Sequence, residues 1–163
     1  MIEAEKALMG AGEAPKEAAG IKAGSHLKSY KDLTSFPEFP PGTKSSVARF
    51  MTKEVFDEYK GKKDAAGVPF EVMVFSGVKN VDSGIGVYAG SHDSYTTFGK
   101  LFDPVIEDYH KHGKADKHVS NMDYTQLNCP PFTEEEAAMI VSTRIRVGRN
   151  LANYPLGPGI SKD

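Results

Sequence analysis

The sequence predicts an α+β protein in which a small helical domain precedes the beginning of a second, sheet-containing domain. Two observations carry this prediction. Between residues 47 and 110, apolar residues recur at intervals of three and four, which is the spacing of helices that pack on a core. From Thr143 to Val147, apolar and polar residues instead alternate, which is the period of a half-buried strand. A lone strand leaves backbone groups unpaired, so this strand requires partners that the preceding residues do not offer.

Length and composition restrict the class of protein. The 163 residues are enough for one ordinary domain, or for a small domain and part of another. A net charge of −2 gives no general attraction for nucleic acid or for an anionic membrane, so we expect neither as a partner. The single cysteine, Cys129, excludes an internal disulfide and fits a reducing compartment. No apolar run approaches the roughly 20 residues that span a bilayer, and we expect a cytoplasmic protein.

The N-terminal residues are expected to contribute little to a core. Residues 1–26 are rich in Ala, Gly, Glu and Lys and predict a flexible tail. Residues 30–43 hold three prolines among aromatic residues. This composition predicts an extended segment that lies over the surface of the following domain.

Residues 27–112 are predicted to form the helical domain. Thr52 is placed to cap a helix that has Glu54 in its first turn and Gly61 at its end. The apolar run at 70–75 fits a strand or a helix, and its helical neighbours favour a helix.

A loop with three glycines at residues 79–90 interrupts this helical pattern. After it, a helix is predicted to begin at Ser91 or Asp93. A further helix is predicted from Asp103, because Asp is a good N-cap and Pro104 suits the first helical position.

The remaining sequence divides into a linker and the start of another domain. Residues 113–133 show no period and predict a linker. Residues 134–163 are interpreted as the start of the second domain, cut short at residue 163, with a strand at 139–147. On that strand Arg144 and Arg146 share one face, roughly 7 Å apart.

Two guanidinium groups at this spacing can each fork onto a different phosphate of a nucleotide. An isolated R-x-R motif is more often the solvated face of an edge strand. These residues alone therefore leave both interpretations open.

The loop Asp82–Tyr88 carries the second chemical pattern. Gly84 and Gly86 let the backbone turn its N–H groups around an anion such as a carboxylate, and Ser83 and Tyr88 add hydroxyl donors. An ordinary turn is the more frequent meaning of an isolated G-x-G. The loop is not a dinucleotide-binding motif, because the third glycine and the βαβ unit are missing.

No metal site and no catalytic residue are expected from the remaining polar residues. His110, His112, His118 and Cys129 fit no zinc spacing. Cys129 also has no basic neighbour or helix N-terminus that would activate its thiol. The acids between residues 103 and 108 suit a first helical turn and receive no catalytic role.

Four sequence blocks together resemble the phosphagen (guanidino) kinases. They are DSGIGVY, LFDPVIEDYH, DKH and STRIRVGR, at residues 82–88, 101–110, 116–118 and 142–149. Their order and spacing are similar to those of the family over roughly residues 45–160. The SGIGVYA loop most resembles that of arginine kinases. Residues 30–43 are similar to other members, so taurocyamine, glycocyamine, lombricine and creatine stay open as substrates.

The resemblance implies a fold and a reaction. The fold is a small all-α N-terminal domain followed by an α/β catalytic domain built on an antiparallel sheet, of which only the N-terminal portion is expected here. The reaction is the reversible transfer of the γ-phosphoryl group of ATP to the guanidino group of L-arginine. It gives phosphoarginine and ADP and buffers cellular ATP. The resemblance also implies Mg²⁺, bound through ATP or ADP and without a ligand from this chain.

The resemblance also assigns residues to the site. Those implied in nucleotide binding are Ser142, Thr143, Arg144, Ile145 and Arg146. Those implied in substrate binding are Ser83, Gly84, Ile85, Gly86, Val87 and Tyr88. The catalytic acids of the family are expected beyond residue 163, so the resemblance implies that this chain alone is inactive.

A rival hypothesis is a non-catalytic anion-binding or interaction module that uses Arg144, Arg146 and Arg149. The sequence assigns no oligomeric state under either hypothesis.

Overall fold

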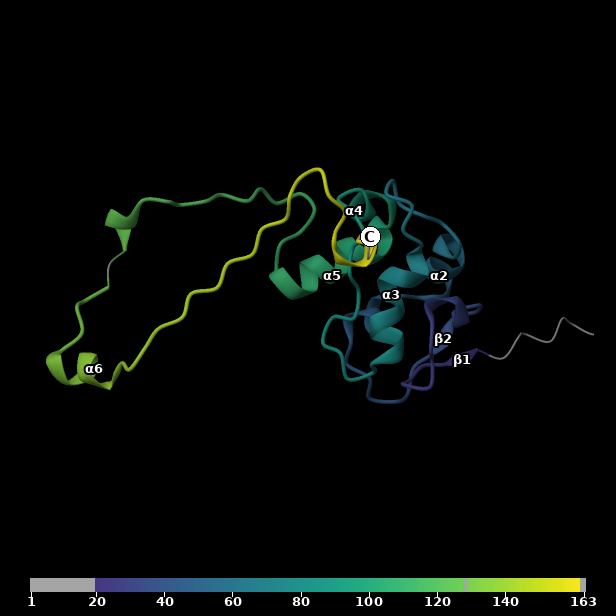
Figure 1. Ribbon diagram of the computed structural model, residues 1–163, viewed down its shortest axis with the longest axis horizontal. Coiled ribbons are helices and arrows are strands. Elements are labelled where there is room, and N and C mark those ends of the chain that lie inside the picture. Colours follow the sequence, from purple (N-terminus) through teal and green to yellow (C-terminus); the bar gives the residue numbers. More distant parts are fainter. Residues whose placement is uncertain (1–19, 128, 162–163) are drawn as a thin grey trace, which may run out of the picture.

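Helices form the body of the structure, a computed structural model that describes residues 20–127 and 129–161 (Figure 1). The part of the predicted tail at residues 1–19 lies outside the described residues. The elements, in chain order, are β1 (Ile21–Lys22), η1 (Tyr30–Asp32), β2 (Pro37–Glu38), α1 (Ser46–Phe50), α2 (Lys53–Tyr59), α3 (Phe70–Lys79), α4 (Ser94–Thr97), α5 (Gly99–His110), η2 (Tyr124–Gln126), α6 (Glu134–Met139) and η3 (Gly157–Gly159).

Aromatic rings from α2, α3 and the start of α5 meet in the core. Phe70 lies 5.2 Å from Phe98 and 5.4 Å from Tyr59, measured between ring centroids. Phe56, Phe70 and Phe98 are fully buried, and Val47 of α1 is buried beside them. Aromatic pairs at these distances stabilise a core beyond the burial of their area. The predicted helical packing of this region is confirmed.

Two of the predicted helices are confirmed with their local signals. Thr52 caps α2, and its hydroxyl accepts a hydrogen bond from the Val55 amide. The ambiguous run at 70–75 is helical and belongs to α3, which buries Phe70 and Met73.

The prediction that a helix begins at Asp103 is wrong. α5 begins at Gly99 and contains Pro104 in its interior. Phe98 and Leu101 are fully buried and continue the apolar stripe of α5 toward the N-terminus. Their burial outweighs the hydrogen bond that a proline removes from a helix.

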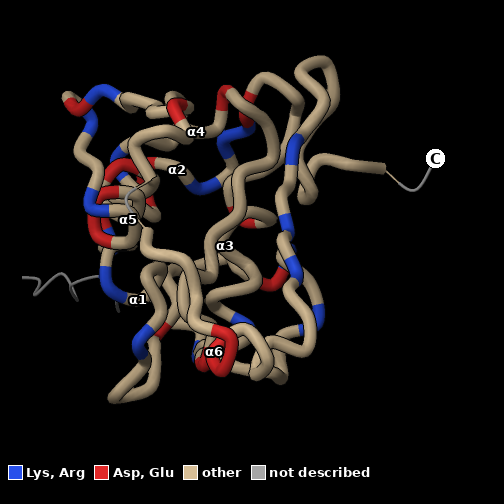
Figure 2. The backbone as a smooth tube through the Cα atoms, turned by 90° about the vertical axis from the view of Figure 1, so that its left-hand side faces the viewer, with Lys and Arg blue, Asp and Glu red and all other residues tan. Residues whose placement is uncertain are grey.

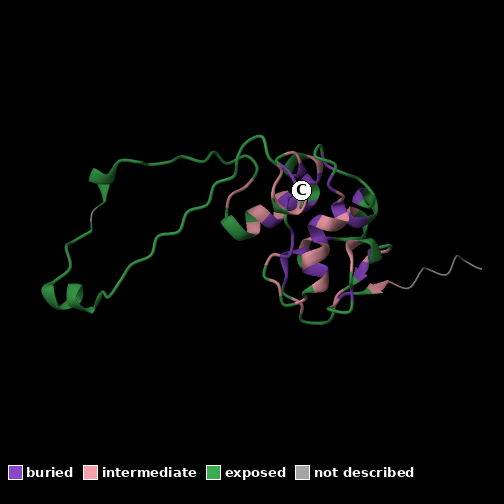
Figure 3. Ribbon diagram, in the orientation of Figure 1, coloured by how far each residue is buried: buried purple, intermediate pink, exposed green. Residues whose placement is uncertain are grey.

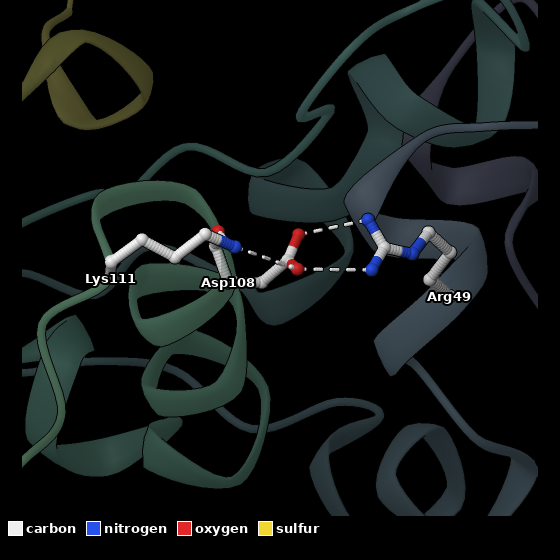
Figure 4. A network of polar contacts seen from close by, with 3 residues as sticks. All are labelled: Arg49, Asp108 and Lys111. Carbon is white, nitrogen blue, oxygen red and sulfur yellow. Dashed lines mark hydrogen bonds and ion pairs between the residues drawn. The ribbon is translucent and has the colours of Figure 1, made fainter.

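An ion-pair network fastens α1 to α5 (Figure 4). The guanidinium of Arg49 donates to both carboxylate oxygens of Asp108, at 2.8 and 3.1 Å. Lys111 lies 3.6 Å from the same carboxylate. The hydrogen bond from Arg49 lowers the pKa of Asp108, with smaller contributions from the charges of Arg49 and Lys111.

The sheet of the described residues is parallel, so the predicted antiparallel sheet is wrong for this part of the chain. β1 pairs with β2, with Ile21 opposite Pro37 and Lys22 opposite Glu38. The pair continues in a hydrogen bond from the Ala23 amide to the Glu38 carbonyl, at 2.9 Å. These short strands belong to the N-terminal segments and not to the region where the sequence predicted a sheet.

The strand predicted at 139–147 is also wrong. Met139 ends α6, and Thr133 begins that helix with a capping box whose other member is Glu136. Residues 140–150 run extended without ladder pairing in the described structure. Ile145 is 91% exposed, so the alternating pattern has no second layer to pack against. Alternation produces a strand only where a partner supplies the ladder hydrogen bonds.

Residues 114–154 leave the helical body and return to it (Figures 1 and 3). All of them for which the structure describes burial are exposed. Glu134, Glu135 and Glu136 make the first turn of α6 acidic (Figure 2). The domain boundaries predicted at residues 27–112, 113–133 and 134–163 stay predictions.

Candidate functional site

The loop between α3 and α4, residues 80–93, holds the predicted substrate residues, and its carbonyl groups turn toward α1. The amides of Ser46 and Val47 donate to the carbonyls of Gly84 and Ile85, both at 3.1 Å. The first amides of a helix have no partner within the helix. The loop carbonyls therefore accept hydrogen bonds from amides in the first turn of α1, and these bonds hold the loop against the helix.

The next residues of the loop are fastened to α3. The Gly77 amide donates to the Gly86 carbonyl at 2.8 Å, and the Tyr88 amide donates to the Met73 carbonyl at 3.0 Å. Gly86 has φ +81°, and a Cβ atom built on it would lie 2.5 Å from the Cα of Gly77. Both the backbone conformation and the contact therefore require glycine at position 86.

Four consecutive amides in the middle of this loop, those of residues 84–87, lack protein acceptors in the described structure. Within residues 20–127 and 129–161, no backbone hydrogen bond is donated by the amides of residues 84–87. The Ser83 hydroxyl has no protein partner in the same ranges, and the Tyr88 side chain is 52% exposed. Unpaired amides and hydroxyls at one loop are the donors that an anion such as a carboxylate requires.

Two hollows adjoin Tyr88. One has a volume of about 310 Å³ and lies between the loop, α5 and the C-terminal residues; its lining includes Val87, Tyr95 and Ile106. The other, of about 640 Å³, is lined by Lys79, Asn80 and residues of α3. Lys79, whose ammonium group lies 5.7 Å from the centroid of the Phe75 ring, adds a positive charge to the lining of this second hollow.

A buried carboxylate fixes the far end of the loop. Asp64 accepts hydrogen bonds from the hydroxyls of Ser91 and Ser94, at 2.8 and 2.6 Å, and from the Val68 amide at 2.9 Å. The Ser94 oxygen in turn accepts from the Gly90 amide at 3.0 Å. Burial raises the pKa of Asp64, but these hydrogen bonds together lower it below its ordinary value. The carboxylate is therefore ionised and holds Gly90 in place.

The predicted nucleotide residues, Ser142, Thr143, Arg144, Ile145 and Arg146, lie in the exposed segment that follows α6. Nearby, the guanidinium of Arg149 donates to the Gly148 carbonyl at 2.7 Å. In the described part of the chain, no hydrogen bond or ion pair joins residues 142–146 to residues 83–88. The structure therefore does not bring the two predicted groups together.

Two further features concern the described residues. No three side chains of the metal-ligating types His, Cys, Asp and Glu gather closely enough there to hold a metal ion. None of the helices described is both long and apolar enough to cross a bilayer.

Comparison with known proteins decides the family. Residues 41–107, from just before α1 to most of α5, match the family described as ATP:guanido phosphotransferase, N-terminal domain. Residues 41–107 belong to the ATP:guanido phosphotransferase family as its N-terminal domain. The matched residues contain the whole loop between α3 and α4, including residues 84–87, whose amides have no acceptor among the described residues.

Relatives of this guanido phosphotransferase chain include proteins named arginine kinase. One from Anthopleura japonica is 41% identical over 150 residues, which are 88% of this chain and 21% of the relative. Another, arginine kinase Scy s 2 from Scylla serrata, is 43% identical over 120 residues, which are 73% of this chain and 33% of the relative. The chain thus spans between a fifth and a third of the length of these relatives.

A solved structure of a lombricine kinase shares the fold of the guanido phosphotransferase chain. It superposes with a TM-score of 0.53 over 67% of this chain and 30% of the other, at 28% identity. The mostly helical arrangement is therefore that of a known family member.

The Asp64 cluster was not identified from the sequence. Asp64 lies three residues before Gly67, and Asp and Gly at these positions indicate a type I turn. That signal predicts that the Asp64 carboxylate accepts hydrogen bonds within its own turn, such as the one donated by the Ala66 amide at 3.0 Å. Nothing local indicates that Ser91 and Ser94 meet the same carboxylate, because that contact spans about thirty residues of chain.

Proposed function

We propose that this chain supplies the substrate-binding N-terminal domain of an arginine kinase, followed from about residue 134 by the start of the nucleotide-binding domain. The observation that supports the proposal is the loop at residues 83–88, in which the amides of residues 84–87 have no acceptor among the described residues and the Tyr88 side chain is 52% exposed. The names of the relatives and the family match support the same activity.

In this proposal the carboxylate of L-arginine lies against the amides of residues 84–87, with the hydroxyls of Ser83 and Tyr88 as further donors. Lys79 adds a favourable charge nearby. A carboxylate held by several such donors is fixed in orientation as well as in place. The guanidino group at the other end of the substrate is thereby positioned for reaction.

The reaction forms a bond between a guanidino nitrogen and the γ-phosphorus of ATP. The bond from that phosphorus to the oxygen of ADP breaks, and the nitrogen gives up a proton. Such a transfer depends on positioning and on neutralising charge more than on covalent chemistry by the protein. A loop that fixes the carboxylate of the substrate serves the positioning part of this requirement.

The nucleotide enters as its magnesium complex. In this proposal Mg²⁺ is bound through the phosphates of ATP or ADP and belongs to the substrate, without a ligand from this chain. Ser142, Arg144 and Arg146 are proposed to contact the ATP phosphates, with Thr143 and Ile145 between them. Arginine is suited to this role because its guanidinium can donate two parallel hydrogen bonds to a phosphate.

Calorimetry with L-arginine and agmatine tests the carboxylate site, because agmatine has the guanidino group of arginine but lacks the carboxylate. We expect weak binding of arginine and at least about tenfold weaker binding of agmatine, the ratio expected from losing a charge-assisted hydrogen bond. Tyr88→Ala should abolish the preference. Tyr124→Ala, in an exposed tyrosine far along the chain, is the matched control and should leave binding unchanged.

Equal affinity for arginine and agmatine, or a preference that survives Tyr88→Ala, would contradict the proposal. Binding of short DNA that weakens with salt and is lost on Arg144→Ala would favour the anion-binding module instead. Lombricine and taurocyamine tested in the same way establish the substrate. A coupled assay with ATP and arginine is expected to show no turnover, since residues 142–146 do not meet the substrate loop.

A further inference from the structure

The chain returns to the helical body at residues 155–159, beside the end of the substrate loop. The Leu156 amide donates to the Gly90 carbonyl at 2.9 Å. The Leu156 side chain is half-buried and packs against the core. Figure 1 shows this segment returning next to α4 and α5 after the long exposed excursion. The contact therefore joins residues that are more than sixty positions apart in the sequence.

Two glycines make this contact close. A Cβ atom built on Gly159 would lie 2.6 Å from the Gly90 carbonyl oxygen and 3.0 Å from a methyl carbon of Val68. A Cβ atom built on Gly90 would lie 2.6 Å from the Cβ of Val68. Neither glycine has a positive φ, so space and not backbone conformation requires them. The backbone is packed so closely here that an added side-chain atom would not fit.

Gly90 is consequently held from three directions. The Ser94 oxygen, which is bound to the buried Asp64, accepts from its amide. Its carbonyl accepts from Leu156, and its Cα lies against Val68. Because Gly90 is only two residues beyond Tyr88, the position of Gly90 constrains the end of the loop that carries Tyr88, whose amide is also bound to the Met73 carbonyl.

The same C-terminal segment also borders the space around Tyr88. Gly157 and Pro158 line both the hollow of about 310 Å³ and that of about 640 Å³. Residues of the helical domain line the other sides of each hollow. The space available to a ligand beside Tyr88 is therefore bounded partly by residues 157 and 158.

We propose that residues 155–159 form a specificity-determining wall of the substrate site: they dock on Gly90, fix the position of Tyr88 and limit the size of the substrate accepted beside it. This inference rests on the proposed function and deepens it, because it assigns part of the site to a segment outside the helical domain. Gly159 acts as a positioning residue, through Gly90, whereas Leu156 both docks on Gly90 and lines the hollow of about 310 Å³.

The experiment compares Gly159→Ala with Gly148→Ala. Gly148 is exposed, lines neither hollow and has no positive φ, and a Cβ atom on it meets nothing within 4 Å. Gly148→Ala is therefore a control that adds the same methyl group without a clash and outside residues 155–159. Leu156→Ala is a second variant, which weakens the docking by lost packing and introduces no clash.

Docking is measured by hydrogen exchange of the Leu156 amide, followed by NMR on the whole 163-residue chain. Substrate selection is measured by calorimetry with arginine and with the longer and shorter guanidino acids homoarginine and 2-amino-3-guanidinopropionate. In Gly159→Ala and Leu156→Ala we expect protection of the amide to fall about tenfold, as for loss of one packed hydrogen bond. We also expect the preference for arginine over homoarginine to fall, and Gly148→Ala to keep both properties.

Unchanged protection of the Leu156 amide in Gly159→Ala would overturn the docking. Lost protection with an unchanged arginine-to-homoarginine ratio would overturn the role in specificity and leave the proposed function standing. If the wild-type chain bound no guanidino acid, the proposed function and the role of this wall would both fail. The exchange comparison would then still decide whether the segment docks.

Discussion

Replacing Gly86 by alanine tests how the substrate loop is held. The new Cβ atom would lie 2.5 Å from the Cα of Gly77, where real Cβ contacts essentially do not occur, and φ at this position is +81°. A left-handed conformation costs an alanine about 1–2 kcal/mol. Forcing an extra carbon into a packed contact costs about 1–3 kcal/mol. The expected loss in the free energy of unfolding is therefore about 2–5 kcal/mol.

Thermal unfolding measures this loss, since about 1 kcal/mol shifts the Tm of a domain of 60–100 residues by about 4–8 °C. We expect Gly86→Ala to lower the Tm by at least about 8 °C, from the smaller of these figures. Gly84→Ala is the control, because a Cβ atom there meets nothing within 4 Å and φ is not positive. A Gly86→Ala protein as stable as Gly84→Ala would show that the loop does not pack on α3 as described.

Two further predictions concern α5 and the exposed segment. The lowered pKa of Asp108 means that its ion pair with Arg49 stabilises the fold above about pH 3.8 and that this contribution is lost as pH falls through the lowered pKa. Urea unfolding should therefore show Asp108→Asn less stable than wild type at pH 7, with the difference shrinking toward pH 2; a difference independent of pH would exclude the ion pair as its cause. Limited trypsin digestion should cut first after Lys117, Arg144 and Arg146, which lie in the exposed residues 114–154, while α3 and α5 stay intact. Mass spectrometry identifies the fragments, and early cuts after Lys79 of α3 or Lys100 of α5 would contradict the expectation that these helices stay intact.

Local signals predicted the helical elements where local and tertiary preferences agree. Thr52 caps α2 because the cap hydrogen bond is made within four residues of chain. The Asp103-Pro104 signal is equally local but failed, because the buried stripe that includes Phe98 and Leu101 extends the helix toward its N-terminus. Packing outweighed the capping preference at that position.

The strand predicted at 139–147 shows that a local pattern is not sufficient where tertiary partners are missing. Its alternation is a property of the segment alone, whereas a strand needs backbone partners from elsewhere. Val141 and Ile145 are 97% and 91% exposed, so the described structure supplies neither partners nor a covering layer. The docking of Leu156 on Gly90 could not be predicted for a related reason, because both residues lie in loops without a period.

For the site, the residues of the loop were predictable and its hydrogen bonds were not. Gly84 and Gly86 indicate a loop that can expose amides. The sequence does not show that Ser46, Val47 and Gly77 engage the carbonyls of that loop. These contacts depend on how α1 and α3 are placed relative to one another.

The carbonyl hydrogen bonds of Gly84, Ile85 and Gly86 have a consequence for binding energetics. They preorganise the loop, so that its backbone is ordered when the protein folds and not when a ligand arrives. Ordering a segment on binding consumes part of the interaction free energy, and this loop avoids that loss. Affinity for a small amino acid then depends on the donors presented and not on refolding of the loop. The backbone of residues 84–88 should accordingly differ little between the free and the bound protein.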